Sequence, residues 1–327
     1  MARALALAKA AWGSTAPNPA VGCVLVAPDG RTIGEGATAH GGRPHAEAVA
    51  LAQAGTRARA STAYVTLEPC AHASARGLAC ADLLIAAGIA RVVAALPDPD
   101  PRTHGQGFAR LRGAGIVVET GEGAAEAAAI IAGFAHRIAT GRPRVTLKLA
   151  LSIDGRIALA DGRSRWITGE QARAHAHTER ARADLIVIGR GTLEADDPTL
   201  DVRLPGQEHR SPRPAILSRT LAQVPATRRL AARNPLILPS PQAIDSLPLN
   251  DILVEGGGET AHAFLQANRV DRLLIYRAPI LLGADARPGV GALALVDLAH
   301  AHGHWCRTDC LPLGPDVLEV YEARPRS

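Results

Sequence analysis

The 327-residue chain is 47% apolar and 20% charged, which excludes a disordered protein, and its length predicts two domains. Charged or polar residues interrupt every apolar run before it could span a bilayer, so we expect no membrane insertion and a cytoplasmic location. The net charge of +5 does not indicate a nucleic-acid-binding protein, because 31 acidic residues are interleaved with the basic ones and there are only three each of Trp, Tyr and Phe for stacking on bases.

The first 140 residues alternate between predicted strands and predicted helices. Lys9 interrupts the apolar N-terminal stretch, which therefore fits a short amphipathic helix better than a signal peptide. Strand-helix alternation of this kind predicts an α/β sandwich whose sheet is partly parallel. The pattern predicts helices at 3–11, 45–54, 80–88 and 106–113, a long Ala-rich helix at 123–139, and strands at 20–26, 31–37, 62–67, 91–96 and 116–119.

The GRPR segment at 141–144 is a plausible hinge, after which the alternation restarts. We therefore predict two domains, 1–142 and 143–327. In the second domain the pattern predicts long exposed loops at 201–213 and 239–249, and two helices, at 167–183 and after a glycine turn that follows 251–254. Strands are predicted at 145–153, 184–190, 214–217, 235–238, 251–254 and 271–280, with one more closing the chain within 311–323.

One imidazole and two thiols in the first domain form a ligand set suited to zinc. These are His45, Cys70 and Cys80. Three protein ligands leave one tetrahedral position open for a water, whose pKa zinc lowers from about 15.7 towards about 7. Glu47, two residues after His45, could take up that proton without binding the metal. The H-A-E and E-P-C steps match the zinc deaminase signature, and we expect both at helix starts.

The other cysteines are interpreted as structural or free. Five is an odd number, and their spacing does not indicate a disulfide framework. A closed structural zinc site would need a fourth ligand, which Cys23 or His72 could supply, but Cys23 lies in an apolar strand and fits a small buried hydrophobe better. Cys306 and Cys310 have no companion pair and are expected to be free thiols.

A single lysine marks the second domain. Of 36 basic residues only Lys9 and Lys148 are lysines, and Lys148 lies in the apolar stretch VTLKLALS. It could be a strand-end lysine that reaches water. Because this chain uses arginine wherever a generic cation suffices, a functional lysine is the preferred interpretation. The turn EGGGET at 255–260 could hold a phosphate on backbone amides or could be a tight connection only.

Taken together, the motifs resemble one family, the bifunctional riboflavin-biosynthesis deaminase–reductases. The resemblance runs through nearly the whole chain and is weakest from about 205 to 250. It implies a cytidine-deaminase-like α/β/α sandwich followed by a dihydrofolate-reductase-like α/β domain. The motifs are PNPAVGCVLV, PHAEAVAL, YVTLEPCAH, DPDPRTHGQG, GRPRVTLKLALSIDGRIA, SRWITGE and ADDPTLDVR, in that order along the chain.

The family implies two successive reactions on a phosphorylated pyrimidine, a zinc-dependent deamination and an NADPH-dependent reduction of the ribosyl chain. It implies zinc on His45, Cys70 and Cys80, and catalytic roles for Glu47, Lys148 and Asp196, the last two being candidates for the reductase proton donor. Cofactor contacts are implied for Ala150, Trp166, Thr168, Thr192, Asp196, Gly256, Gly257 and Gly258. Substrate contacts are implied for Asn18, His72, Ser164, Arg180, Leu200, Arg203 and Glu255.

Two features depart from common patterns. Nine residues separate Cys70 from Cys80, against two in nucleic-acid deaminases, and the 73–79 loop differs from the family's pattern and is one residue longer.

Alternative interpretations remain for two residues and for the whole chain. Trp166 could also be a core residue and Asp196 a solvated loop acid. A nucleic-acid base deaminase with a C-terminal binding module and a non-enzymatic zinc module remain as alternatives. We expect a homo-oligomer, a dimer or a tetramer, with no nucleic-acid partner.

Overall fold

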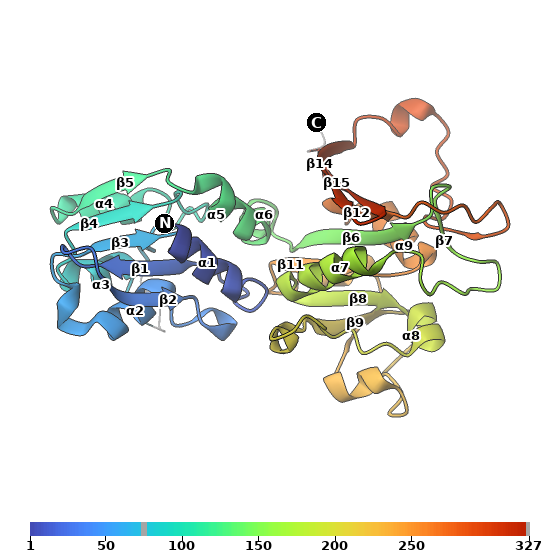
Figure 1. Ribbon diagram of the computed structural model, residues 1–327, viewed down its shortest axis with the longest axis horizontal. Coiled ribbons are helices and arrows are strands. Elements are labelled where there is room, and N and C mark those ends of the chain that lie inside the picture. Colours follow the sequence, from blue (N-terminus) through green and yellow to red (C-terminus); the bar gives the residue numbers. More distant parts are fainter. Residues whose placement is uncertain (73–76, 325–327) are drawn as a thin grey trace. The chain divides into compact units, whose positions relative to one another are not determined.

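The computed structural model describes residues 1–72 and 77–324 (Figure 1). The altered loop segment at 73–76 therefore lies outside the described residues. The chain divides into two compact units, Met1–Gly141 and Arg142–Ser327, and the division falls within the GRPR segment. In the part of the chain that the structure describes, no helix combines the length and the apolar character needed to cross a membrane.

The first unit is built on a five-stranded sheet in the order β2-β1-β3-β4-β5. β1 pairs antiparallel with β2 and β3, whereas β3, β4 and β5 are parallel, as predicted. Helices α1 and α2 pack on opposite faces of β1 and β2. The strands are β1 (Gly22–Val26), β2 (Thr32–Ala37), β3 (Thr62–Val65), β4 (Arg91–Ala94) and β5 (Val117–Thr120), and the helices are α1 (Ala2–Ala11), α2 (Ala46–Ala54), α3 (Cys80–Ala86), α4 (Gln106–Gly113), α5 (Ala124–Ile130) and α6 (Ala132–Thr140).

Two predictions for this unit are wrong. The Ala-rich stretch forms two helices, because Ile131 leaves the helical conformation with φ −96° and ψ 12°. Ile130 and Ile131 are both buried in the core, and a continuous helix would point adjacent side chains about 100° apart. Cys70 does not begin a helix either. It lies in a loop after β3, and the following helix, α3, begins only at Cys80.

The second unit contains an eight-stranded sheet in the order β10-β9-β8-β11-β6-β12-β15-β14. The strands from β10 to β12 are parallel, and β15 and β14 continue the sheet in antiparallel pairing. The strands are β6 (Arg144–Leu151), β8 (Leu185–Gly189), β9 (Arg213–Leu217), β10 (Leu236–Leu238), β11 (Asp251–Val254), β12 (Arg272–Arg277), β14 (Trp305–Leu313) and β15 (Asp316–Ala323). A second, two-stranded sheet pairs β7 (Arg156–Ala158) with β13 (Arg287–Pro288), and the helices are α7 (Glu170–Arg182), α8 (Arg190–Asp196) and α9 (Gly258–Gln266).

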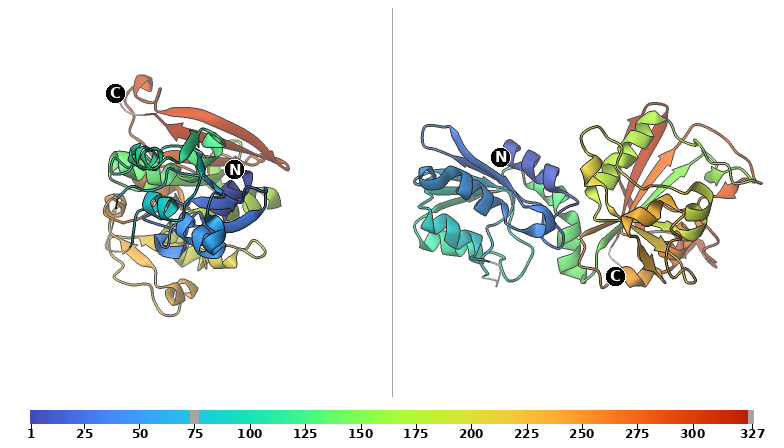
Figure 2. Two further views of the ribbon diagram at one scale, coloured as in Figure 1. Left: turned by 90° about the vertical axis from the view of Figure 1, so that its left-hand side faces the viewer. Right: turned by 90° about the horizontal axis from the view of Figure 1, so that it is seen from below.

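The sequence pattern missed some of these elements. The chain closes with a hairpin, β14–β15, at the edge of the sheet, where one strand is predicted (Figure 1 and Figure 2). Gly314 turns this hairpin with a φ of 69°. Helix α8 has only seven residues, too few for a clear helical period, and β7 and β13 are shorter still. The predicted loops contain single 3₁₀ turns at Glu208–Arg210 and Pro241–Ile244.

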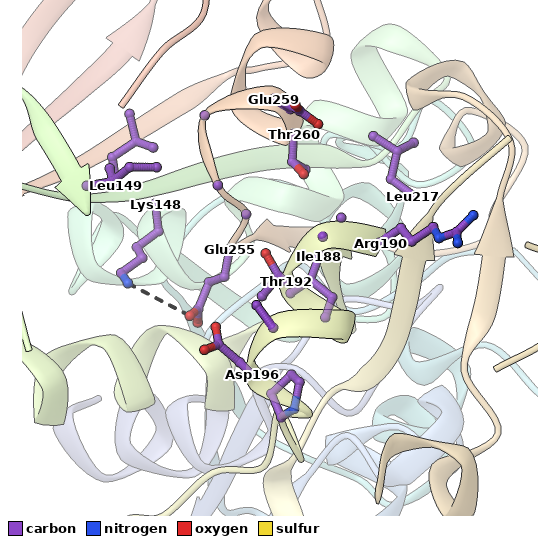
Figure 3. A pocket seen from close by; sticks show the side chains of 18 of the residues that line it. Lys148, Leu149, Ile188, Arg190, Thr192, Asp196, Leu217, Glu255, Glu259 and Thr260 are labelled. Atoms are coloured by element: carbon purple, nitrogen blue, oxygen red, sulfur yellow. Dashed lines mark ion pairs between the residues drawn. The ribbon is translucent and has the colours of Figure 1, made fainter. Parts of the chain in front are cut away.

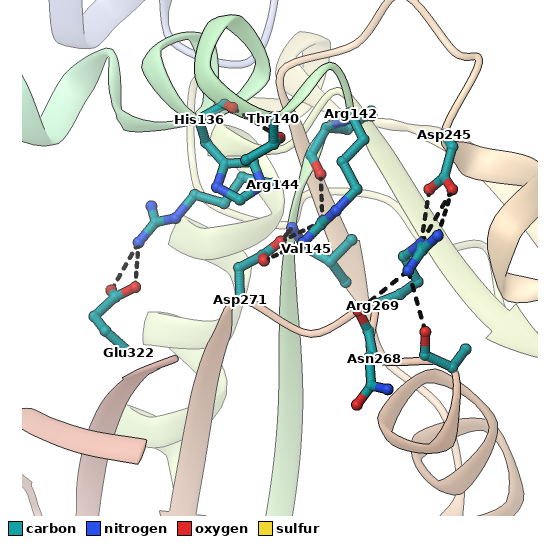
Figure 4. A network of polar contacts seen from close by, with 12 residues as sticks. His136, Thr140, Arg142, Arg144, Val145, Asp245, Asn268, Arg269, Asp271 and Glu322 are labelled. Atoms are coloured by element: carbon teal, nitrogen blue, oxygen red, sulfur yellow. Dashed lines mark hydrogen bonds and ion pairs between the residues drawn. The ribbon is translucent and has the colours of Figure 1, made fainter. Parts of the chain in front are cut away.

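Ion pairs fix the start of strand β6 (Figure 4). Arg142 donates to both carboxylate oxygens of Asp271, at 2.8 and 2.6 Å, and Asp271 also accepts the backbone N–H of Val145 at 2.8 Å. Arg144 donates from Nη2 to both oxygens of Glu322 on β15, at 2.7 and 2.8 Å. These contacts join β6 to the beginning of β12 and to β15, and so set the position of the strand that carries Lys148.

We predict that Gly36→Ala destabilises the first unit. A Cβ atom at Gly36 would lie 2.3 Å from the carbonyl oxygen of Ala46 and 2.7 Å from the backbone nitrogen of Ala50, so α2 would have to move off the sheet. Overpacking of this kind costs about 1–3 kcal/mol. Thermal unfolding of the full chain should show a lower transition temperature.

Gly113→Ala is the matched control, because a Cβ there meets nothing within 4 Å and the residue ends a helix of the same unit. A Gly36→Ala protein as stable as this control would contradict the close packing of α2 on β2.

Candidate functional site

The three predicted zinc ligands come together in the first unit. His45 is the N-cap of α2, Cys80 is the first residue of α3, and Cys70 lies in the loop after β3. His45 Nδ1 lies 3.3 Å from Cys80 Sγ and 3.6 Å from Cys70 Sγ. All three ligand atoms are within 4.8 Å of one another. The helix N-termini and the loop therefore bring the nitrogen and both sulfurs to one point.

The donor set fits zinc. A tetrahedral ion with a Zn–N distance of about 2.1 Å and a Zn–S distance of about 2.3 Å would hold a nitrogen and a sulfur ligand about 3.6 Å apart. The two nitrogen–sulfur separations, 3.3 and 3.6 Å, are close to this value. No fourth His, Cys, Asp or Glu of the described residues joins the group. Cys23 lies outside it and is fully buried, as a structural cysteine should be.

Hydrogen bonding in the cluster favours the thiolate form of Cys70. Hydrogen bonds from the Cys80 side chain, with a further contribution from His45, lower the pKa of Cys70 to about 4. The backbone N–H of Cys80 also donates to Cys70 Sγ at 3.2 Å. Cys80 is the partner that retains a proton, and its pKa is raised by the bond to Cys70 and by burial. Binding of a divalent cation would displace that proton.

Glu47 and Asn18 flank the cluster. Glu47 lies in the first turn of α2 with 3% of its surface exposed, and burial raises its pKa, with the Cys70 charge adding to the effect. Asn18 Nδ2 donates to the carbonyl oxygen of Gly42 at 2.7 Å and lies 3.2 Å from His45 Nε2. A buried carboxylate and an amide therefore lie beside the three ligands.

Glu68, for which the sequence motifs predict no role, organises the loop at 98–108. Its carboxylate accepts the backbone N–H groups of Asp98, Gly105 and Phe108, at 3.1, 2.9 and 3.1 Å. A side chain at Gly107 would lie 2.1 Å from the carbonyl oxygen of Pro69, so the loop packs directly on the E-P-C step. The motifs E-P-C and DPDPRTHGQG are the sequence signal that could have linked Glu68 to this loop.

The same loop contacts His72 through Thr103. Thr103 Oγ1 lies 3.2 Å from His72 Nδ1 and accepts the backbone N–H of Ala71 at 3.4 Å. His72, which could have supplied a fourth ligand, is not part of the ligand group. Its predicted contact with substrate remains a prediction.

A large cavity in the second unit brings together every residue predicted for the reductase site. Its volume is about 1640 Å³, and it lies at the carboxyl ends of β8, β9 and β11 and beside β6 (Figure 3). The predicted residues that line it are Lys148, Ala150, Ser164, Trp166, Thr168, Arg180, Thr192, Asp196, Leu200, Arg203, Glu255, Gly256, Gly257 and Gly258.

Lys148, Glu255 and Arg180 form the charged centre of this cavity. Arg180 donates to both oxygens of Glu255, at 2.7 and 2.9 Å, and to the carbonyl oxygen of Asp201 at 3.0 Å. Lys148 Nζ lies 3.9 Å from Glu255 Oε2 (Figure 3). Burial alone would raise the pKa of Glu255, but Arg180 and Lys148 lower it to about 2. Lys148 lies within β6 rather than at a strand end, and burial lowers its pKa.

The glycine turn is required by close packing. β11 ends at Val254, Gly257 is the N-cap of α9, and the helix begins at Gly258, as predicted. A Cβ at Gly256 would lie 2.3 Å from the Thr260 Cβ, and one at Gly258 would lie 2.6 Å from the carbonyl oxygen of Pro288. The turn thus serves as a tight connection, and it also opens a helix N-terminus into the cavity, where a phosphate could bind.

Trp166 and Asp196 both line the cavity. Trp166 is 63% exposed, which excludes a core role, and the Arg173 guanidinium lies 4.9 Å from its ring centre. Asp196 ends α8, with Arg165 Nη2 3.5 Å from its Oδ1. The family roles of both residues stay predictions.

Several residues that line the cavity were not predicted. On α7, Arg173 and His177 line the cavity with Arg180, and their spacing of four and three residues was the available signal, because it places all three on one helix face. At the ends of β8 and β9, Arg190 donates from Nη1 to Thr220 Oγ1 at 2.9 Å, beside Arg219. The short β7 contributes Ile157, for which the sequence pattern carried no signal.

Both units match known protein families. Residues 1–96 match the family model of the cytidine and deoxycytidylate deaminase zinc-binding region, and residues 143–310 match that of the RibD C-terminal domain. The riboflavin biosynthesis protein RibD of Escherichia coli is 40% identical over 339 residues, covering 90% of this chain and 92% of that protein. The chain belongs to the RibD family.

Other members of the RibD family are similar to this chain over nearly its full length. RibD of Mycobacterium tuberculosis H37Rv is 38% identical over 95% of this chain and 93% of that protein. The structure of Acinetobacter baumannii RibD is 36% identical, with a TM-score of 0.84 over 99% of this chain and 97% of that one. A deaminase/reductase structure from Thermotoga maritima is 30% identical, with a TM-score of 0.86 over 99% and 97% of the two chains.

These similarities confirm the expected fold classes, a cytidine-deaminase-like unit followed by a dihydrofolate-reductase-like unit of the RibD type. They also exclude the two alternative interpretations, a nucleic-acid base deaminase with a C-terminal binding module and a non-enzymatic zinc module. The second unit is a RibD reductase domain and not a nucleic-acid-binding module, and the three-ligand metal group does not fit a closed, four-ligand zinc module.

We predict that the purified protein binds one zinc ion per chain and that Cys80→Ser loses most of it, because a serine hydroxyl replaces a thiolate ligand. Elemental analysis after dialysis against a competing chelator would measure the metal content.

Cys310→Ser is the matched control, since Cys310 is an exposed free thiol in the second unit. Equal zinc loss from both variants, or none from Cys80→Ser, would contradict the assignment of the ligands.

Proposed function

We propose that this protein catalyses two successive steps of riboflavin biosynthesis. The first is the hydrolytic deamination of 2,5-diamino-6-(5-phosphoribosylamino)pyrimidin-4(3H)-one, and the second is the NADPH-dependent reduction of the ribosyl chain to give 5-amino-6-(5-phosphoribitylamino)uracil. The observation that carries the proposal is the presence, in one chain of the RibD family, of a three-ligand zinc group and of a cavity lined by all the residues expected for the reductase. The Thermotoga maritima relative carries the names of both activities.

In the first unit, His45, Cys70 and Cys80 would hold the zinc ion, which supplies an activated water for attack on the ring carbon. The buried carboxylate of Glu47 would move the proton of that water to the departing amino group, so that ammonia leaves. Asn18, oriented by its bond to the carbonyl oxygen of Gly42, would hold the pyrimidine. The 98–108 loop, tied down by Glu68, would form the neighbouring wall of the site.

In the second unit, NADPH supplies the hydride. The amino end of α9 at Gly257 and Gly258 would hold the cofactor phosphates, because free backbone N–H groups and the helix dipole favour an anion there. Lys148 would bind the substrate near the reacting ribose carbon, and Glu255 would keep the Lys148 ammonium group in place. Both Lys148 and Asp196 line the cavity, so both remain candidates for the proton donor.

The expected location, oligomeric state and substrate class are also part of this proposal. We propose that the protein works in the cytoplasm as a homo-oligomer, a dimer or a tetramer, on a small phosphorylated pyrimidine. The relatives of the RibD family support the substrate class. Gel filtration with light scattering would measure the oligomeric state directly.

We predict that single substitutions separate the two activities. Glu47→Gln should lower the rate of ammonia release on the order of a hundredfold or more, since it removes a general acid–base group, while NADPH oxidation with pre-deaminated substrate continues. Lys148→Met should lower NADPH oxidation on the order of a hundredfold, because it removes a positioned charge, while ammonia release continues. Both rates are measured in the full chain.

Wild-type protein is the reference for both assays. Wild type that releases no ammonia but oxidises NADPH with the pre-deaminated compound would show that this chain lacks the first activity. A wild-type chain without either activity would refute the proposed function.

A further inference from the structure

One face of helix α7 lines the reductase cavity with three nitrogen-bearing side chains. Arg173, His177 and Arg180 are spaced four and three residues apart, so they lie above one another on the same face. From Arg173 to Arg180 the helix rises about 10 Å, which is enough to follow a phosphorylated ligand along the cavity wall.

The two arginines of this face already have partners. Arg173 donates from Nη1 to the carbonyl oxygen of Thr168 at 2.6 Å and lies over Trp166. Arg180 uses Nε and Nη2 for Glu255 and Nη1 for the carbonyl oxygen of Asp201. Both guanidinium groups therefore hold parts of the protein in place.

His177 is different, because only one of its ring nitrogens is used. Nδ1 accepts the backbone N–H of Arg203 at 3.2 Å, so it carries no proton, and the proton of the neutral ring is on Nε2. In the part of the chain that the structure describes, Nε2 makes no hydrogen bond. His177 therefore offers the cavity a single N–H donor of fixed tautomer.

The charges around His177 favour an anionic ligand. Arg180 lies on the same helix, Arg203 and Asp201 on the facing segment, and Glu255 at the end of β11. Burial first, and then Arg180 and Arg203, lower the pKa of His177 to about 4, and Glu255 and Asp201 act in the opposite direction. The two carboxylates are themselves held by partners, Glu255 by Arg180 and Asp201 by Thr199. The Arg203 guanidinium makes no ion pair with any described residue.

We propose that His177 binds the phosphate group of the reductase substrate through Nε2–H, next to the guanidinium of Arg203, while Nδ1 holds the Leu200–Arg203 segment against α7. The inference rests on the proposed reductase function. The phosphate is that of the substrate and not of the cofactor, because the glycine turn at the start of α9 provides the separate site suited to the cofactor phosphates. The role is one of binding and positioning, with no part in the hydride step.

Two substitutions separate the two ring nitrogens. In His177→Asn the amide oxygen can take the place of Nδ1 and still accept the Arg203 N–H, but the donor into the cavity is lost. In His177→Gln the amide nitrogen reaches the position of Nε2, so the donor is kept. His209→Asn is the matched control, because His209 is exposed and does not line the cavity.

The experiment measures kcat and KM of the full-length variants for NADPH and for the deaminated substrate, with and without its phosphate. His177→Asn should raise KM for the phosphorylated substrate roughly ten- to a hundredfold, the usual effect of losing a hydrogen bond to a charged group. Its kcat, its KM for NADPH and its KM for the dephosphorylated substrate should change by less than about threefold, and His177→Gln should restore most of the affinity. Inorganic phosphate, as a competitive inhibitor, should bind more weakly to His177→Asn than to wild type or His209→Asn.

Several outcomes overturn the inference. These are an unchanged KM in His177→Asn, an equal rise for the dephosphorylated substrate, a rise in KM for NADPH instead, or a His177→Gln protein as impaired as His177→Asn. In each of them wild type still reduces the deaminated substrate, so the proposed function stands. Wild type that oxidises no NADPH with that substrate would overturn the function and the inference together.

Discussion

The reductase unit depends on one buried carboxylate, that of Glu255. A charge at the end of β11 is stable only because Arg180 satisfies both of its oxygens and Lys148 lies 3.9 Å away. Removing one partner of such a group leaves a buried charge uncompensated, at a cost of about 3–5 kcal/mol. Because Arg180 also binds the carbonyl oxygen of Asp201, this ion cluster joins α7, β6, β11 and the segment after α8. The need to neutralise Glu255 therefore fixes how these four segments meet at the cavity.

In the deaminase unit, close packing and one buried carboxylate hold the residues of the site in position. Its small residues let α1 and α2 approach the sheet closely, and this places His45 at the start of α2 with its ring towards the two cysteines. The 98–108 loop beside the metal group has backbone turns of its own, in which the N–H groups of Thr103 and His104 donate to the carbonyl oxygen of Asp100. Glu68 ties these turns down, because its one carboxylate accepts three backbone N–H groups of the loop. Both units thus use a buried carboxylate to hold a wall of the site, and in neither unit is that carboxylate a metal ligand.

Much of this arrangement could be predicted from the sequence, and the failures have physical causes. Strong periods predicted α2, α7 and the parallel strands, and the ligand types predicted the metal group. The break at Ile131 was missed because alanine-rich sequence favours helix on both sides, and only burial of Ile130 and Ile131 in the core decides it. Cys70 was placed at a helix start because nothing local shows that the chain runs on to Cys80 before α3 begins. Motif and spacing point to the neighbourhood of Glu68 and His177, but not to their hydrogen-bond partners, which are backbone groups of distant segments.

The preference for lysine at position 148 has an explanation in this ion cluster. Both oxygens of Glu255 are already bound by the planar fork of Arg180, so a second guanidinium would compete for the same acceptors, whereas a compact ammonium can approach from the side. Lys148 also lies 5.9 Å from the ring centre of Tyr276, which favours a cation without binding it strongly. Burial lowers the pKa of the lysine, and an arginine could not lose its proton in the same place. A chain that uses arginine almost everywhere else therefore keeps lysine where the geometry accepts only a point charge and where a proton can be exchanged.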